Sequence, residues 1–212
     1  MFQLIDSPSI ANRFLAELRD LEIQKDSFRF RKNLERLGEI FAYEISKTFY
    51  FREKNIQTPL SAMVTTLPEE KPVIFAVLRA SLPFYQGFLN FFDDAESGFI
   101  GAFREEGEDI KINLGYHASP SLEGKTVILA DPMLATGKSF LKSIETLVKH
   151  GNPKIIHIAA VIAAPEGIQF LKENLSLPYS LWIGDIDEKL NSKSYIVPGL
   201  GDAGDLAFGP KL

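Results

Sequence analysis

The sequence predicts an α/β protein in which helices cover both faces of a central, mainly parallel sheet. Continuous apolar runs at residues 72–78, 127–130 and 155–162 support this prediction. Such runs are typical of parallel strands that are buried on both faces. Segments with apolar residues at helical spacing lie between them, and 212 residues are enough for one well-buried core. We therefore expect a single domain over residues 1–212.

Composition and charge exclude several classes of protein. The chain has no cysteine, so disulfides, thiolate metal sites and cysteine nucleophiles are excluded. It has no long apolar run, and its first six residues carry no positive charge before a hydrophobic stretch, so we expect a cytoplasmic protein without a membrane segment. The net charge of −5 gives no general attraction to nucleic acids or anionic membranes. Any bound phosphate must therefore be held by a local site.

Residues 8–50 are expected to form helices. Apolar residues at helical spacing predict an amphipathic helix over residues 10–20, and Asp26 is a suitable N-cap for a longer helix that follows. The apolar stripe of the longer helix consists of Phe30, Leu34, Leu37, Phe41 and Ile45. Its other faces carry Arg29, Arg31, Lys32 and Arg36. These cations fit either a charged helix exterior or a patch for a phosphate or nucleotide effector.

Residues 48–70 are expected to be a connection with one small strand at most, because the pattern is mixed and contains Pro59 and Pro68. The buried strand at 72–78 then ends at Arg79. Ligands of open α/β sheets gather at the carboxyl ends of strands, which makes Arg79 a candidate for anion binding.

Arg104 stands at the end of a further expected strand, residues 97–103. The guanidinium groups of Arg79 and Arg104 have the fixed donor geometry that suits phosphate oxygens. Apolar and polar residues alternate from 110 to 116, which predicts a half-exposed strand of an antiparallel ribbon. Between these strands, the acidic residues 105–109 are expected to form a solvated loop.

The segment around which the chain is organised is Lys125–Ser139. A buried strand stops at Asp131 and Pro132, and Thr136-Gly-Lys-Ser139 opens a helix that is closed by Gly151. A strand–turn–helix of this kind directs backbone N–H groups and the positive end of the helix dipole outward, which makes an anion cradle. A triphosphate loop is disfavoured because Pro132 stands where that motif requires glycine.

The last third of the chain contains two further candidate sites. Asp185 and Asp187 follow an expected strand at 181–183, where they fit either a capped turn or a carboxylate metal site. His157 lies in a buried strand and is interpreted as a hydrogen-bonded core residue. Three glycines within residues 199–204 predict a loop whose backbone approaches a ligand closely.

Two of these motifs resemble the uracil phosphoribosyltransferases. Asp131-Pro-Met-Leu-Ala-Thr-Gly137 resembles the loop that binds phosphoribosyl diphosphate (PRPP), and residues 190–209 resemble the uracil-recognition segment. The resemblance extends from Phe28 over nearly all of the chain. It implies a type I phosphoribosyltransferase fold, with a parallel sheet of about five strands flanked by helices. It further implies a β-ribbon flap at residues 104–122 and a small C-terminal hood at residues 185–212.

The resemblance also implies the reaction and the residues that carry it. Uracil and PRPP would give UMP and diphosphate, and Mg²⁺ would be carried mainly by PRPP, without a metal site built from protein side chains. PRPP binding is assigned to Arg79, Arg104, Asp131, Pro132, Met133, Leu134, Ala135, Thr136, Gly137, Lys138, Ser139 and Asp202. Uracil binding is assigned to Ile196, Gly201, Asp202 and Ala203, and catalysis to Arg104, Asp131 and Asp202. Some members of the family are activated by GTP, and members form homodimers or higher homo-oligomers.

The chain departs from the family pattern at two positions in these loops. Ser81 replaces a glycine, so a positive φ at this position would be strained, and Lys138 replaces another glycine. Two other functions on the same fold stay open: a catalytically weak sensor of uracil or UMP, and a regulator of pyrimidine genes. An RNA-binding regulator would need a basic face, which the acidic composition disfavours.

Overall fold

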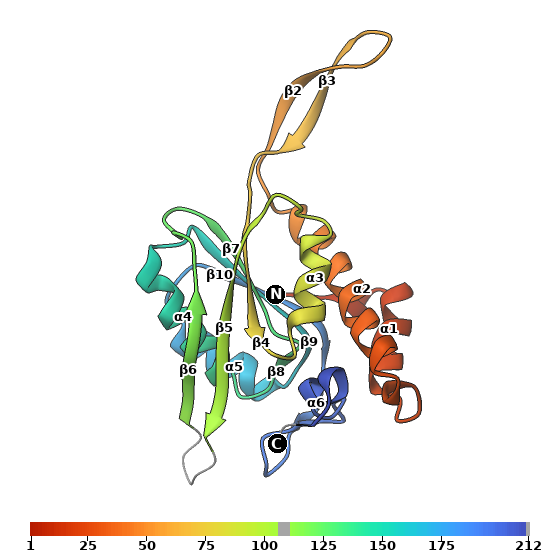
Figure 1. Cartoon of the computed structure of the whole chain (residues 1–212), viewed down its shortest axis with the longest axis vertical. Helices are drawn as coiled ribbons and strands as arrows, with labels where there is room; N and C mark the ends of the chain where they lie inside the picture. The colour runs from red at the N-terminus through yellow and green to blue at the C-terminus, as the bar shows by residue number, and fades with distance from the viewer. Residues whose placement is uncertain (106–110, 211–212) are drawn as a thin grey trace.

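The α/β class is confirmed by a computed structural model, which describes residues 1–105 and 111–210 and, for residues 102–105 and 111–117, the backbone alone. A central sheet carries helices on both faces (Figure 1). The elements in chain order are β1 (Phe2–Gln3), η1 (Leu4–Asp6), α1 (Ile10–Arg19), η2 (Ile23–Lys25), α2 (Ser27–Ser46), β2 (Phe51–Gln57), β3 (Ala62–Pro68), β4 (Val73–Leu78), α3 (Leu82–Leu89), β5 (Glu96–Glu105), β6 (Lys111–Ala118), β7 (Thr126–Ala130), β8 (Met133–Leu134), α4 (Lys138–Leu147), η3 (Val148–His150), β9 (Ile155–Ala163), α5 (Pro165–Asn174), β10 (Tyr179–Ile186), β11 (Lys189–Leu190), β12 (Ile196–Val197) and α6 (Ala203–Phe208).

The main sheet is larger than the expected five strands. Within the described residues its order is β1-β10-β9-β7-β4-β5-β6, and β8 pairs with β9. All neighbours are parallel except β5 and β6, which are antiparallel. The expectation was too small because the two-residue strands β1 and β8 are too short to give a periodic signal. From the centre, the chain extends in one direction through β4 and β5 and in the other through β7, β9 and β10.

Side chains of the central strands alternate between two apolar layers. Ile74 and Ala76 pack with the layer under α1, α2 and α3. Val73, Phe75 and Val77 pack with the layer under α4 and α5. Because both faces are covered, β4 reads as a continuous apolar run instead of an alternating one.

The expected N-terminal helices are confirmed as α1 and α2. The Asp26 side chain accepts from the backbone N–H groups of Phe28 and Arg29, as an N-cap does. All members of the apolar stripe of α2 are buried. The first residue of α1 is an exception to its expected apolar face, because the Ile10 side chain is exposed. Among the described residues, none of the helices combines the length and the apolar character that crossing a membrane requires.

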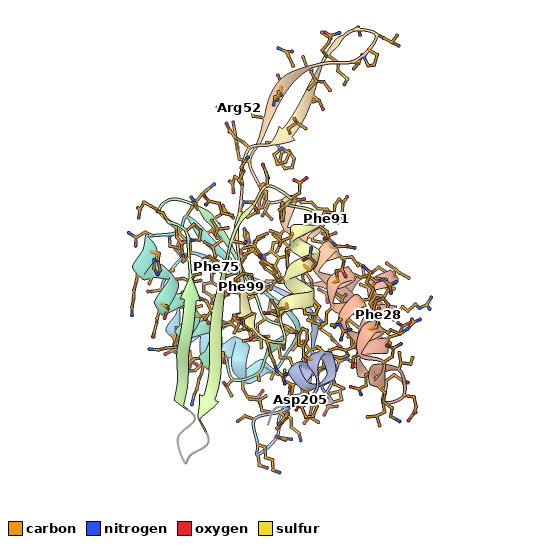
Figure 2. All side chains as sticks on the ribbon, in the orientation of Figure 1. Phe28, Arg52, Phe75, Phe91, Phe99 and Asp205 are labelled. Atoms are coloured by element: carbon orange, nitrogen blue, oxygen red, sulfur yellow. The ribbon has the colours of Figure 1, made fainter. Side chains whose placement is uncertain are left out.

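The prediction for residues 48–70 was wrong. Strands β2 and β3 form a long antiparallel hairpin with continuous pairing from Phe51–Pro68 to Gln57–Ala62. The hairpin extends away from the body at the edge opposite to α6 (Figure 1), and Arg52 lies on it outside the packed core that contains Phe75 and Phe99 (Figure 2). Almost every residue of both strands is exposed, so neither face shows the apolar alternation that identifies a strand.

The expected antiparallel ribbon is confirmed in its backbone. Strands β5 and β6 pair from Phe99–Ala118 to Glu105–Lys111, with a register shift after Gly101. Residues 106–110 of the expected acidic loop lie outside the described residues.

Candidate functional site

The candidate site lies at the carboxyl edge of the sheet, where the strand order changes direction. Strands β4 and β7 are neighbours, and Ala76 lies opposite Ala130. Arg79 and Asp131 follow these strands within a few residues, so both stand at this edge. In open α/β sheets, such a switch point is the usual position of a ligand. Strands β5 and β9 also end here, which brings further loops to the same edge.

The loop after β7 makes a tight glycine turn that leads directly into helix α4. Met133 and Leu134 pair with β9, and the chain then turns at Gly137, whose φ is +77°, into α4. A Cβ at Gly137 would lie 2.9 Å from the carbonyl oxygen of Gly167, so only glycine fits this turn. The N-terminus of α4 therefore starts beside this turn, with its unpaired N–H groups and the positive end of its dipole.

Polar side chains line the same loop. Asp131 Oδ1 accepts from the backbone N–H of Met133 at 3.2 Å, and Thr136 Oγ1 accepts from the N–H of Lys138 at 3.4 Å. Lys138 is exposed, while Thr136 and Ser139 are half-buried. The loop thus combines hydroxyl donors, backbone donors and one cation.

Arg79 connects β4 to the C-terminal segment. Its Nη2 donates to Asp205 Oδ1 at 2.7 Å and to the carbonyl oxygen of Gly209 at 2.8 Å. Its Nε is buried without a hydrogen-bond partner. The expected strain at the neighbouring Ser81 is absent, because this residue has a φ of −75° and its hydroxyl donates to the carbonyl oxygen of Val77 at 2.6 Å. The serine therefore adopts an ordinary helical conformation, and no positive φ is needed.

The C-terminal segment folds back over this edge. Strands β11 and β12 form a short antiparallel pair, and Asp202 caps α6 by accepting from the N–H of Asp205 at 3.0 Å. Ile196 and Ala203 are buried in the same apolar cluster as Ala130 and Ala135 of the β7 loop. Arg79, directly after β4, binds Asp205, and the N–H of Asp187 donates to the carbonyl oxygen of Ala163 at the end of β9, so the C-terminal segment lies at the same sheet edge as the β7 loop.

The structure does not place every candidate residue in the site at the sheet edge. The backbone of Arg104 pairs with Ile112, but the Arg104 side chain lies outside the described residues. Asp185 and Asp187, which the sequence fits to either a capped turn or a metal site, bind Arg19 through Nη2 at 2.8 and 2.6 Å. The described residues contain no group of three or more His, Asp or Glu side chains that could hold a metal ion.

Sequence reasoning missed two residues of this region. Arg19 ends an ordinary amphipathic helix, outside any recognisable motif, and Asp205 lies in the 190–209 motif without a role assigned to it. Only the fold brings each to its partner, 168 residues away for Arg19 and Asp187, and 126 residues away for Asp205 and Arg79.

His157 is confirmed as a core residue. Its Nδ1 accepts from Nε1 of Trp182 at 3.0 Å, and burial lowers the pKa of His157 to about 4. This imidazole is neutral near pH 7 and lies within the sheet, which argues against a catalytic role.

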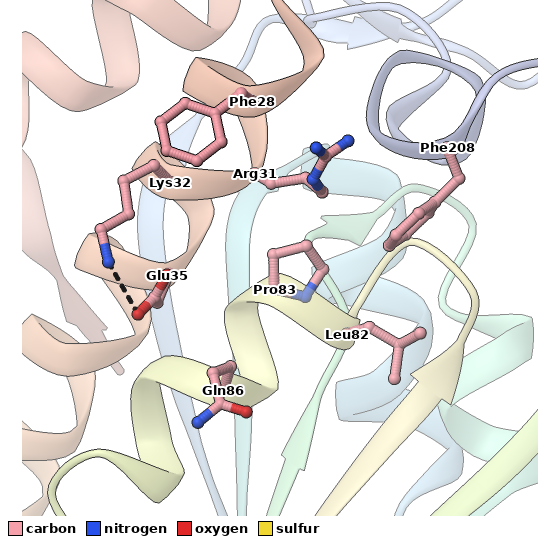
Figure 3. Close-up of a pocket in the computed structure, with 8 residues that line it drawn as sticks. All are labelled: Phe28, Arg31, Lys32, Glu35, Leu82, Pro83, Gln86 and Phe208. Atoms are coloured by element: carbon pink, nitrogen blue, oxygen red, sulfur yellow. Dashed lines mark hydrogen bonds and ion pairs between the residues drawn. The ribbon is translucent and has the colours of Figure 1, made fainter.

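A pocket lies between α2, α3 and α6. The pocket, of about 290 Å³, is lined by Phe28, Arg31, Lys32, Glu35, Leu82, Pro83, Gln86 and Phe208. Figure 3 shows the Phe28 and Phe208 rings on either side of Arg31, and the ion pair between Lys32 and Glu35. Arg31 donates to the carbonyl oxygen of Ala207 at 2.6 Å, so this cation also anchors α6.

A parallel sheet with a glycine turn and a helix N-terminus at its switch point defines a phosphate-binding α/β protein, the class that includes the phosphoribosyltransferases. The chain matches the family model of uracil phosphoribosyltransferase over residues 5–210, and it belongs to this family. The type I phosphoribosyltransferase fold implied by the sequence is thereby confirmed.

Individual relatives agree over the full length of the chain. A uracil phosphoribosyltransferase of Porphyromonas gingivalis is 45% identical over 206 residues, which cover 96% of this chain and 95% of that protein. A uracil phosphoribosyltransferase of Pyrococcus furiosus is 40% identical, with 99% of this chain and 90% of that protein covered. The solved structure of the AQ2163 protein from Aquifex aeolicus is 32% identical and superposes with a TM-score of 0.88, with 99% and 98% of the two chains covered.

Proposed function

We propose that this chain transfers the 5-phosphoribosyl group from PRPP to uracil, giving UMP and diphosphate. Membership of the family supports the reaction. The observation that carries the proposal is the convergence of two segments on one sheet edge: the anion cradle at residues 131–139 and the glycine-rich loop at residues 196–203. A substrate with a phosphate at one end and a planar base at the other fits this arrangement.

The cradle would hold the 5-phosphate. Its proposed contacts are the backbone N–H groups and side-chain hydroxyls of the loop, which provide donors without a buried counter-charge. The residues of this contact are Asp131, Pro132, Met133, Leu134, Ala135, Thr136, Gly137, Lys138 and Ser139. Lys138 is exposed at the first turn of α4, where an ammonium group can add a further phosphate contact.

Arg79 and Arg104 would bind the diphosphate. In the structure the guanidinium of Arg79 is already directed to the sheet edge by Asp205 and Gly209. The buried Nε of Arg79, which has no partner, is a donor that an incoming anion can satisfy.

Uracil would be read by backbone groups of Ile196, Gly201 and Ala203, and Asp202 would contact the ribose. Ile196 and Ala203 are buried, so their peptide groups are held at fixed positions. Cytosine presents a different donor and acceptor pattern, which would leave buried groups unpaired, and it should therefore be rejected.

Chemically, the bond from the anomeric carbon to diphosphate breaks, a bond to a uracil ring nitrogen forms, and the proton of that nitrogen is released to solvent. The transition state resembles an oxocarbenium ion, so positioning and charge stabilisation matter more than a strong protein base. Arg104, Asp131 and Asp202 are the proposed catalytic residues, and the ribbon at 104–122 and the segment at 185–212 are the proposed flap and hood.

Mg²⁺ is the proposed cofactor. The donor set of the site fits an ion held mainly by substrate oxygens, because Asp131 is the carboxylate of the cradle and its Oδ1 already accepts a backbone N–H. A bound Mg²⁺ would supply positive charge for the diphosphate leaving group.

Assembly, location and regulation complete the proposal. A homodimer or higher homo-oligomer is supported by the hairpin β2–β3, whose apolar side chains are exposed. A cytoplasmic location follows from the substrates that such a reaction would use.

GTP is the proposed effector, and the pocket at Phe28 and Phe208 supports it because aromatic faces and cations suit a nucleotide. UMP formation with and without GTP tests this part, and an unchanged rate would remove the effector.

The central test is UMP formation by the purified chain with uracil, PRPP and Mg²⁺. The unmodified chain is expected to turn over, and Arg79→Ala should lower kcat/KM for PRPP by about a hundredfold, since charged contacts to phosphate are strong. Arg104→Ala is a parallel variant. Uracil binding by calorimetry without UMP formation in the unmodified chain would contradict the transferase and favour a uracil sensor.

A further inference from the structure

We propose that Arg19 is a positioning residue for the loop that reads the base, and that it acts through Asp187 and Gly199. The inference rests on the proposed function, because it assumes that residues 196–203 contact uracil. The inference gives a role in the proposed site to helix α1, which lies outside both of the loops at the sheet edge.

The guanidinium of Arg19 makes four short contacts. Nη1 donates to Asp187 Oδ2 and to the carbonyl oxygen of Gly199, both at 2.9 Å. Nη2 donates to Asp187 Oδ1 at 2.6 Å and to Asp185 Oδ2 at 2.8 Å. Arg19 thus grips Asp187 with both ends of its planar fork, which a lysine ammonium cannot do.

Asp187 connects Arg19 to the loop at residues 196–203. Its side chain is nearly buried, and its Oδ2 also accepts from the N–H of Gly199 at 2.9 Å. Its own N–H donates to the carbonyl oxygen of Ala163 at 2.8 Å, at the end of β9. The carboxylate is therefore fixed to the sheet before it contacts the loop.

Gly199 is held at both of its backbone polar atoms. Its N–H is bound by Asp187 and its carbonyl oxygen by Arg19. Its φ is +66°, and a Cβ would lie 2.2 Å from the carbonyl oxygen of Ile196, so the turn requires glycine. Gly199 lies between Ile196 and Gly201, the two proposed contacts to the base, so fixing its peptide sets their spacing.

This arrangement predicts an effect on base binding that exceeds the effect on PRPP binding. Substrate positioning within a fraction of an ångström depends on the groups that support the contacting residues. The hydrogen bonds that Arg19 donates go to Asp185, Asp187 and Gly199, which belong to the C-terminal segment and not to the cradle at 131–139. A residue that only stabilised the fold would instead weaken both substrates alike.

The test compares Arg19→Met and Arg19→Lys with the control Arg13→Met. Arg13 lies on the same helix, is largely exposed and pairs with Glu17 instead of the hood. In steady-state assays of the full chain, both Arg19 variants should raise the uracil KM by about tenfold and the PRPP KM by no more than about threefold, because one proposed PRPP contact, Asp202, lies in the same loop. Both Arg19 variants should also discriminate less well between uracil and cytosine. The control Arg13→Met should change neither the uracil KM nor the PRPP KM.

Calorimetry of uracil binding and thermal unfolding complete the experiment. If Arg19→Met does not fold, Asp187→Asn removes the charge and keeps an oxygen that can accept from Gly199, and it should raise the uracil KM in the same selective way. Equal rises in both KM values, or a lower unfolding temperature with an unchanged uracil KM, would overturn the inference. An unmodified chain that neither binds uracil nor forms UMP would overturn the proposed function, and the inference with it.

Discussion

At the residue scale, Asp202 combines a structural contact with a charge that the proposed site uses. Its Oδ1 caps α6 by accepting from the N–H of Asp205. Asparagine caps helices about as well as aspartate, so a change to asparagine removes the charge and keeps the cap. Asp202 is therefore a position where structure and chemistry can be separated.

We predict that Asp202→Asn lowers kcat for UMP formation by about tenfold, with a free energy of unfolding within about 0.5 kcal/mol of the unmodified chain. Steady-state kinetics and urea unfolding measure the two effects. Asp26→Asn is the matched control, because Asp26 caps α2 through its side chain in the same way and is not one of the proposed site residues. Unchanged kinetics in Asp202→Asn would remove this residue from the site.

Gly137 is the residue on which the shape of the anion cradle depends. Gly137→Ala should raise the PRPP KM by about tenfold or more, because the new Cβ would press on the Gly167 carbonyl and the left-handed conformation costs roughly 1–2 kcal/mol. Gly124→Ala is the control: Gly124 has a similar positive φ, but a Cβ there has open space. The control should lose stability and keep its PRPP KM. A normal PRPP KM in Gly137→Ala would contradict the proposed cradle.

At the element scale, the hairpin β2–β3 is a long two-stranded ribbon in which almost every residue is exposed. Isolated hairpins are marginally stable in water. Ile56 lies directly opposite Met63, and both side chains are partly exposed. An exposed apolar pair on a protruding ribbon favours an interface with a second copy.

We predict that Ile56→Ser combined with Met63→Ser weakens self-association, because the change removes apolar area from the proposed interface. Sedimentation velocity over a range of protein concentrations measures the effect. Lys54→Ser with Thr65→Ser, the neighbouring polar pair on the same face, is the control and should associate normally. An unmodified chain that stays monomeric at every concentration would contradict the proposed assembly.

At the scale of the whole molecule, His157 makes stability depend on pH. The pKa of His157 is lowered by burial from 6.5 to about 4 in the folded chain. As pH falls from 6.5 to about 4, the unfolded chain binds a proton at this residue and the folded chain does not, so acid favours unfolding. Above pH 6.5 His157 is mostly neutral in both the folded and the unfolded chain, so this loss of stability is absent.

This linkage amounts to about 3 kcal/mol of stability lost between pH 7 and pH 4. We predict that His157→Asn flattens this part of the pH profile in urea unfolding, since asparagine can still accept from Trp182 and does not titrate in this range. An equal slope in His157→Asn would show that other groups cause the acid sensitivity.

The sequence by itself determined the fold class, the principal helices and the buried strands. Continuous apolar runs such as 73–78 are typical of strands covered on both faces, and Asp26 indicates a helix start because its side chain can cap one. The cradle was also predictable, because a strand, a positive-φ glycine and a helix start are local features of one segment. The family likewise followed from local motifs.

Only the tertiary structure determined the features that depend on contacts between distant parts of the chain. It showed that residues 51–68 form a hairpin, that Arg19 binds Asp185 and Asp187, and that Arg79 binds Asp205. No local pattern encodes these pairs, since a charged side chain has the same propensity whether it meets solvent or a distant partner. Partners more than a hundred residues apart are chosen by the packing of the whole sheet and its helices, and this packing is expressed only in the folded chain.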